Sequence, residues 1–75
     1  MDWKPYLTTD LEIMHGVVCL KGTRIPASVV LDNLAAGATA QKIMDQYPSV
    51  KPEHIPATIA YAAELARERI VPIPA

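Results

Sequence analysis

The amino-acid sequence predicts a mainly α-helical domain: a three-helix helix-turn-helix (homeodomain-like) unit preceded by one or two short β-strands. Three observations lead to this prediction. Apolar residues recur at helical spacing in three segments between residues 27 and 69. Proline or glycine separates these segments. Short runs of β-branched and other apolar residues, interrupted by glycine, occupy the chain before residue 21, and the length of 75 residues suits a single domain over residues 1–75.

The N-terminal part is expected to be the least regular. Residues 1–5 are predicted to form a loose arm, and residues 6–20 the short strands. The apolar run 17–20 lies between two glycines, which is typical of a strand, and His15 with Gly16 suits a turn before it. An isolated hairpin is only marginally stable in water, so these strands must pack on the helices or on a second copy of the chain.

A turn is expected at residues 21–26, and the first helix at residues 27–36. Gly22 permits a positive φ in the turn, and Pro26 suits a change of chain direction before the first helical turn. Gly37 fits the C-terminal cap of this helix. The apolar residues at helical spacing are Val30, Leu31 and Leu34.

The second helix is predicted at residues 40–46, with Thr39 as its N-cap and Pro48 beyond its end. The third is predicted to begin at Pro52 and to end near Arg69. The short connection between them is compatible with a helix-turn-helix, whose final helix lies in the major groove of DNA. The predicted inward-facing residues of the third helix are Ile55, Ile59, Ala62, Ala63 and Ala66. Residues 70–75 form an extended apolar tail rich in proline.

Composition and charge restrict the classes of function. A chain of 75 residues builds a small core, so a homodimer or higher homo-oligomer is expected. The net charge of −1 provides no overall attraction to nucleic acid. Cys19 is the only cysteine, and His15 and His54 have no second ligand at metal-binding spacing, so we expect no disulfide within the chain, no metal and no cofactor. The absence of a long apolar run and of a signal-peptide pattern predicts a cytoplasmic protein without a membrane span.

A more specific pattern begins with Lys21-Gly22-Thr23-Arg24-Ile25-Pro26. Gly16 precedes this turn, and Ala36-Gly37 and Tyr47-Pro48 end the two helices that follow it. Ala60-Tyr61-Ala62 lies in the third helix. With these motifs in this order, the chain resembles domain-of-unknown-function family 433 (DUF433) from about residue 7 to residue 65.

The chain departs from the family pattern at two places. Val17-Val18 stands where the family usually has a basic residue and a proline, and Val50-Lys51 stands where it often has Leu-Thr. The resemblance implies a helix-turn-helix antitoxin that binds a PIN-like nuclease toxin encoded beside it, with binding to its own operator DNA as a second role. It implies no active-site residue.

Basic and polar residues of the turn and of the third helix are the candidate DNA contacts: Lys21, Arg24, Lys51, His54 and Thr58. A purely structural explanation stays open for both groups. Gly22 and Thr23 could simply form the turn, with Arg24 capping a carbonyl or pairing with an acid such as Asp32. The start of the third helix could be a solvated first turn, since Glu53 would repel phosphate and no Arg, Asn or Gln follows within two turns.

A second set of apolar residues is the candidate protein interface: Val17, Val18, Tyr61, Leu65, Ile70, Val71 and Ile73. The alternative is that they pack beneath the strands. For so small a chain, the two explanations can describe the same surface.

Catalysis is not expected. Cys19 and His15 lack an orienting acid at a defined spacing, so Cys19 is better explained as a small buried hydrophobic residue. The helical acids Asp32 and Asp45 have no acidic partner three or four residues away, which argues against the metal site of a nuclease.

The sequence therefore predicts a binding module rather than an enzyme, and a protein partner is favoured over DNA. The leading hypothesis is an antitoxin-type module that neutralises a PIN-like nuclease toxin and dimerises through its N-terminal strands. Two alternatives remain: a helix-turn-helix transcriptional regulator that binds DNA as a dimer, and an oligomerisation module without a ligand.

Overall fold

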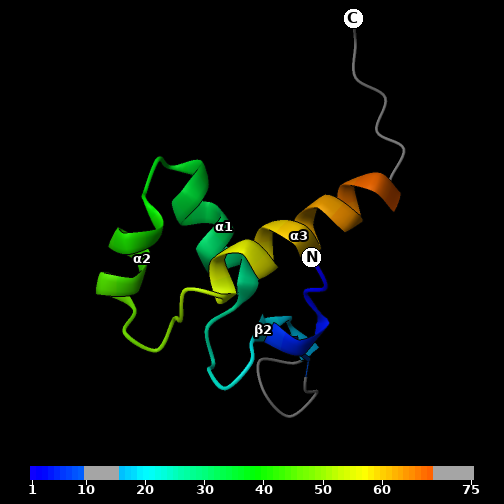
Figure 1. The fold of residues 1–75 in the computed structure, drawn as a ribbon, viewed down its shortest axis with the longest axis horizontal. Coiled ribbons are helices and arrows are strands. Elements are labelled where there is room, and N and C mark those ends of the chain that lie inside the picture. Colours follow the sequence, from blue (N-terminus) through cyan, green and yellow to red (C-terminus); the bar gives the residue numbers. More distant parts are fainter. Residues whose placement is uncertain (10–15, 69–75) are drawn as a thin grey trace, which may run out of the picture.

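The computed structural model describes residues 1–9 and 16–68 of the chain. It contains a short 3-10 helix, two strands and three α-helices (Figure 1), which confirms the predicted mainly helical fold with a small N-terminal sheet. In chain order these elements are η1 Lys4–Tyr6, β1 Leu7–Thr8, β2 Cys19–Leu20, α1 Ala27–Ala35, α2 Ala40–Gln46 and α3 His54–Glu68.

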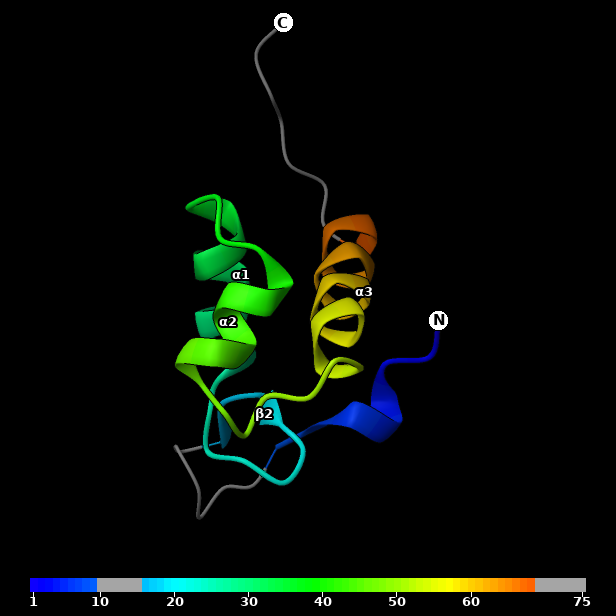
Figure 2. The ribbon, with the colours of Figure 1, turned by 60° about the vertical axis from the view of Figure 1, so that its left-hand side comes forward.

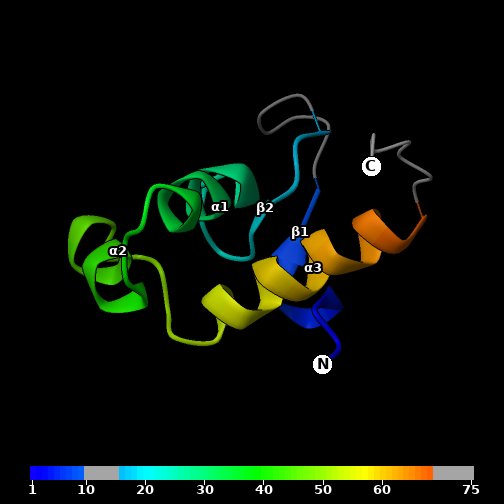
Figure 3. The same cartoon turned by 90° about the horizontal axis from the view of Figure 1, so that it is seen from above.

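Helix α3 is the element around which the others are arranged. Figure 2 shows α1 and α2 together on one side of α3 and the N-terminal segment on the other. Seen from above, β1 lies beside α3 (Figure 3), and α3 contacts α1, β1 and η1. Helix α2 packs on α1 at the end of the molecule farthest from the N-terminus.

The sheet is antiparallel, with β1 paired to β2 in the register Leu7 to Leu20 and Thr8 to Cys19. A single bridge joins Cys19 to Pro26 on the other side of β2. Strand β2 is therefore the middle of three extended segments, and both of its side chains are buried. This position explains why Cys19, as expected, is a small buried residue.

The turn after β2 is closed by a single threonine. Gly22 has a φ of +83°, which a residue with a side chain adopts only with strain. The Thr23 hydroxyl donates to the Leu20 carbonyl oxygen at 2.9 Å and accepts from the Ile25 amide at 3.0 Å. The structural explanation of this motif, in which Gly22 makes the turn and Thr23 bonds nearby backbone, is confirmed.

The helix ends follow local sequence signals. Thr39 caps α2, because its side chain accepts a hydrogen bond from the Lys42 amide at 3.1 Å. Gly37, with a φ of +93°, follows α1 as expected for a C-terminal cap. The predicted bounds of α1 and α2 therefore agree with the structure to within one residue.

The core is aliphatic and draws on every part of the described chain. Its buried cluster consists of Leu7, Leu20, Val30, Ile43, Val50 and Ile55. Aromatic side chains lie at its edge: Trp3, Tyr47 and Tyr61 are partly buried against it. The hairpin thus packs on the helices and does not stand alone.

The predicted inward face of α3 holds at Ile55 and in part at Ala62, which is half-buried, but is wrong at Ile59, Ala63 and Ala66. Ile59 is 48% exposed, and Ala63 and Ala66 are exposed, whereas Ala57 and Thr58 are buried. Helix α3 carries apolar residues on nearly all sides, so hydrophobic spacing alone does not select the face that meets α1 and β1.

The N-terminal residues, expected to form a loose arm, contact α3 instead. Trp3 is partly buried, and its indole N–H donates to Glu64 Oε2 at 2.9 Å. The indole ring also meets the Tyr61 ring edge to face, with 4.9 Å between centroids. Within residues 1–9 and 16–68, no helix is long and apolar enough to cross a membrane, and no cluster of His, Cys, Asp and Glu suited to a metal ion is present.

Candidate protein-interaction site

An apolar groove lies between α1, α3 and the segment that enters β2. It has a volume of about 260 Å³, and we call it the α1–α3 groove. Its lining residues are Val17, Val18, Ala27, Ser28, Leu31, Tyr61 and Leu65. Four of the seven residues predicted as a protein interface, namely Val17, Val18, Tyr61 and Leu65, are thereby brought to one place.

Helical periodicity explains why the residues of α1 and α3 meet at this groove. Tyr61 and Leu65 are four residues apart on α3, and Ala27 and Leu31 are four residues apart on α1, so each pair lies on one helix face. Because α1 packs on α3, the two faces form opposite walls. Val17 and Leu65 remain 44% and 42% exposed, so the groove presents apolar side chains to solvent.

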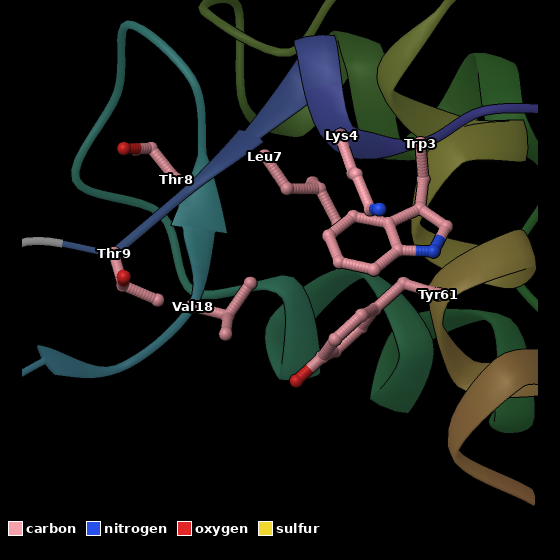
Figure 4. Close-up of a pocket in the computed structure, with 7 residues that line it drawn as sticks. All are labelled: Trp3, Lys4, Leu7, Thr8, Thr9, Val18 and Tyr61. Atoms are coloured by element: carbon pink, nitrogen blue, oxygen red, sulfur yellow. The ribbon is translucent and has the colours of Figure 1, made fainter.

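A second hollow lies on the other side of Tyr61, against the N-terminal segment (Figure 4). It has a volume of about 390 Å³, and we call it the Trp3 hollow. Its lining residues are Trp3, Lys4, Leu7, Thr8, Thr9, Val18 and Tyr61. Val18 and Tyr61 line both the Trp3 hollow and the α1–α3 groove, so the two depressions adjoin each other.

Sequence reasoning missed Trp3 and Glu64 as parts of this region. Their hydrogen bond joins positions 61 residues apart, and no local pattern encodes such a contact. The available signal was that Trp3 is the only tryptophan of the chain. Burial of a large aromatic side chain is energetically favourable, so a tryptophan tends to hold its segment against the rest of the fold.

Two of the predicted DNA contacts are wrong. His54 is 4% exposed and Thr58 is fully buried, so neither can reach a base edge. The Thr58 hydroxyl donates to the Ile55 carbonyl oxygen at 2.8 Å, and His54 Nδ1 accepts from the Lys51 amide at 3.0 Å. The Thr58 hydroxyl is satisfied by a carbonyl of α3 and the His54 ring by an amide just before α3, which lets both side chains face the core.

The three remaining predicted contacts, Lys21, Arg24 and Lys51, are exposed cations. The exposed residues in the first half of α3 and just before it are otherwise poor partners for DNA: Pro52, Glu53, Pro56 and Ile59. None of these four side chains donates a hydrogen bond to a base edge or carries a positive charge. The start of α3 therefore lacks the chemistry of a recognition helix, except at Lys51.

The Cys19 thiol donates a hydrogen bond to the Val17 carbonyl oxygen at 3.4 Å and is buried. This placement agrees with a structural role. His15, Ile70, Val71 and Ile73 lie outside the described residues.

Comparisons with known proteins agree on one family. Residues 7–62 match the model of the family described as "Protein of unknown function (DUF433)". A crystal structure of a DUF433 member protein from Anabaena variabilis ATCC 29413 superposes with a TM-score of 0.74 at 19% sequence identity. The superposition covers 84% of this chain and 62% of that protein, so this chain spans less than two thirds of its length. No curated protein matches the sequence significantly.

Proposed function

The chain belongs to the DUF433 family, and from that premise we propose that it is an antitoxin-type binding module that neutralises a PIN-like nuclease toxin. In this proposal the chain is not an enzyme. It acts in the cytoplasm by covering a surface of the toxin with its own apolar side chains.

The α1–α3 groove is the observation that supports the proposal most. Val17 and Leu65 project apolar atoms into solvent beside half-buried Val18 and Tyr61. Apolar side chains around a concave surface are typical of the centre of a protein interface, where their burial contributes most of the binding free energy. Tyr61 adds a phenol that can donate one hydrogen bond at the edge of such an interface.

The charge of the chain is also in keeping with a protein partner. The net charge is −1, and the described lining of the groove contains no charged side chain. Association through this surface therefore depends on apolar burial and is expected to be weakly sensitive to salt.

Co-expression with the product of the adjacent gene tests the proposal. The expected result is one complex that stays together on a sizing column. The double substitution of Val17→Ser and Leu65→Ser should separate the two proteins. Ile59→Ser is the matched control, because Ile59 is as exposed as Leu65 but lies outside the groove.

If the two proteins elute separately without any substitution, the antitoxin proposal is wrong. If Ile59→Ser disrupts the complex and the groove variant does not, the partner binds another face of α3. A homo-oligomer that binds neither the adjacent gene product nor DNA would instead support an oligomerisation module.

A DNA-binding dimer is the second candidate, supported by the exposure of Lys21, Arg24 and Lys51. A gel-shift assay at low salt with the DNA upstream of the gene tests it, because phosphate attraction is strongest at low salt. Arg24→Glu and Lys51→Glu should each weaken a shift, whereas Lys42→Glu on α2 serves as the charge-matched control. Absence of a shift at low salt would exclude this function.

A further inference from the structure

The Trp3 hollow has the size of a small-molecule site. Its volume of about 390 Å³ falls within the range of about 300–1,000 Å³ found for ligand pockets. An enclosed apolar cavity of about 150 Å³ accommodates benzene. By this comparison the Trp3 hollow has room for a molecule of one or two rings with a short polar substituent.

The walls of the Trp3 hollow favour a flat, apolar body. The Trp3 and Tyr61 rings meet at 70°, so together they form a corner rather than a stack. Leu7 and Val18 supply aliphatic surface beside this corner (Figure 4). An aromatic ring placed there would contact one ring face to face or edge to face and would displace water from apolar surface.

A hydrogen bond outside the Trp3 hollow fixes the orientation of the Trp3 indole. Its N–H donates to Glu64 Oε2 at 2.9 Å, and Glu64 does not line the Trp3 hollow. The ring therefore stays in place as a wall when the hollow is empty. A wall that needs no rearrangement lowers the entropic cost of binding a ligand.

The charge at the Trp3 hollow has one sign. Lys4 is the only charged residue among its described lining residues. A separate depression behind Trp3 carries both signs, because Lys4 and Arg67 line it together with Asp2 and Glu64. An anionic group is thus favoured on the side of Trp3 that faces Leu7 and Val18.

We propose that the Trp3 hollow binds a small organic anion with an aromatic body, such as an aryl carboxylate. The aromatic body packs in the corner formed by Trp3 and Tyr61, and the carboxylate pairs with the Lys4 ammonium group. This site is independent of the antitoxin proposal, although it shares Val18 and Tyr61 with the α1–α3 groove.

Nuclear magnetic resonance titration of the whole chain with 2-naphthoate tests the proposal. Trp3 is the only tryptophan, so the indole N–H gives a single resonance that reports directly on this wall. The expected result is a saturable shift of the Trp3 indole resonance and of the amides of Leu7, Thr8 and Val18. 2-Naphthamide has the same ring system without the charge, and it should bind about threefold to tenfold more weakly.

Substitution of Lys4 distinguishes specific binding of the anion from nonspecific apolar association. Lys4→Gln should weaken 2-naphthoate by about threefold to tenfold and leave 2-naphthamide within about twofold of the unsubstituted chain. Lys42→Gln, which removes an exposed cation far along the chain on α2, should change neither. Lys4 is exposed, so its substitution is not expected to unfold the domain.

Three outcomes would overturn the proposal. The first is no saturable shift of the Trp3 indole resonance up to the solubility limit of 2-naphthoate. The second is equal affinity for the acid and the amide. The third is a set of shifts centred on Leu31 and Leu65, which would place the ligand in the α1–α3 groove instead.

Discussion

The two halves of α3 lie in different environments. In the first half, Ile55 is 6% exposed and Ala57 and Thr58 are fully buried. In the second half, Leu65 is 42% exposed and Ala63 is exposed. Both halves are rich in alanine and aliphatic residues, but Glu64, Arg67 and Glu68 all lie in the second half, and the first half contains no Asp, Glu, Lys or Arg.

Beyond this difference in charge, the environments differ because of what lies opposite each half. The first half of α3 faces the core cluster, to which α1, β1 and the segment before α3 all contribute. The second half extends past this cluster and is partly covered by the N-terminal segment through Trp3 (Figure 1). The first half therefore stabilises the fold, and the second half supplies side chains to the groove and to the hollow. Four predictions test this division, from the largest expected effect to the smallest.

Replacement of the two isoleucines of α3 should give very different losses of stability. Ile55→Ala removes buried methyl groups and should lower the free energy of unfolding by about 2–4 kcal/mol. Ile59→Ala should lower it by less than about 1 kcal/mol, because Ile59 is already half exposed. Urea unfolding followed by far-UV circular dichroism measures both. Equal losses would mean that the buried and exposed faces within the first half of α3 do not differ as described.

His54 should stabilise the first turn of α3 through its own ring. His54→Ala removes the acceptor of the Lys51 amide and should cost about 1–2 kcal/mol in the free energy of unfolding. His54→Gln should recover part of this loss, since a glutamine at the same position can accept from the same amide. Glu53→Ala, at the exposed neighbouring position, is the control and should change stability by less than about 0.5 kcal/mol.

The contact between Trp3 and Glu64 should couple the N-terminus to the second half of α3. A double-mutant cycle of Trp3→Phe and Glu64→Ala should give a coupling free energy of about 0.5–1 kcal/mol, less than that of a fully buried hydrogen bond to a carboxylate because this one is partly exposed to solvent. Trp3→Phe keeps an aromatic ring against Tyr61, so the cycle isolates the hydrogen bond. Trp3→Phe combined with Glu53→Ala should be additive. A coupling of zero would mean that this hydrogen bond does not help to hold the N-terminal segment on α3.

Leu65→Ser should have the smallest effect on the isolated chain, below about 0.5 kcal/mol in the free energy of unfolding. Leu65 would become buried if two copies of the chain associated through the α1–α3 groove. If two copies associate through the α1–α3 groove, the unfolding midpoint of the unsubstituted chain will rise with protein concentration, and Leu65→Ser will abolish this dependence. Unfolding at two protein concentrations distinguishes the cases. A large loss that does not depend on concentration would show that Leu65 packs within one chain.

The elements that could be predicted are those with local causes. Gly22 and Thr23 close the turn, Thr39 caps α2, and Gly37 follows α1, each through contacts within a few residues along the chain. The bounds of α1 and α2 follow from these signals. The family could also be predicted, because its motifs are short, ordered and local.

The candidate site could be predicted only in part. Val17, Val18, Tyr61 and Leu65 were identified as apolar residues without an evident partner, and the structure places all four around one groove. His54 and Thr58 are predicted DNA contacts because they lie at the start of the third helix, where a recognition helix meets DNA. In the structure their polar atoms bond to backbone groups three residues earlier in the chain, so burial costs them little.

Sequence by itself determined where this chain turns, where its helices begin and end, and which family it belongs to. These features depend on backbone conformation and on hydrogen bonds between near neighbours. Tertiary structure decided which face of α3 is buried, how Trp3 is anchored, and that a groove and a hollow meet at Tyr61. The physical reason is that an alanine-rich helix offers several apolar faces of similar free energy. Only packing against α1, β1 and Trp3 selects one of them.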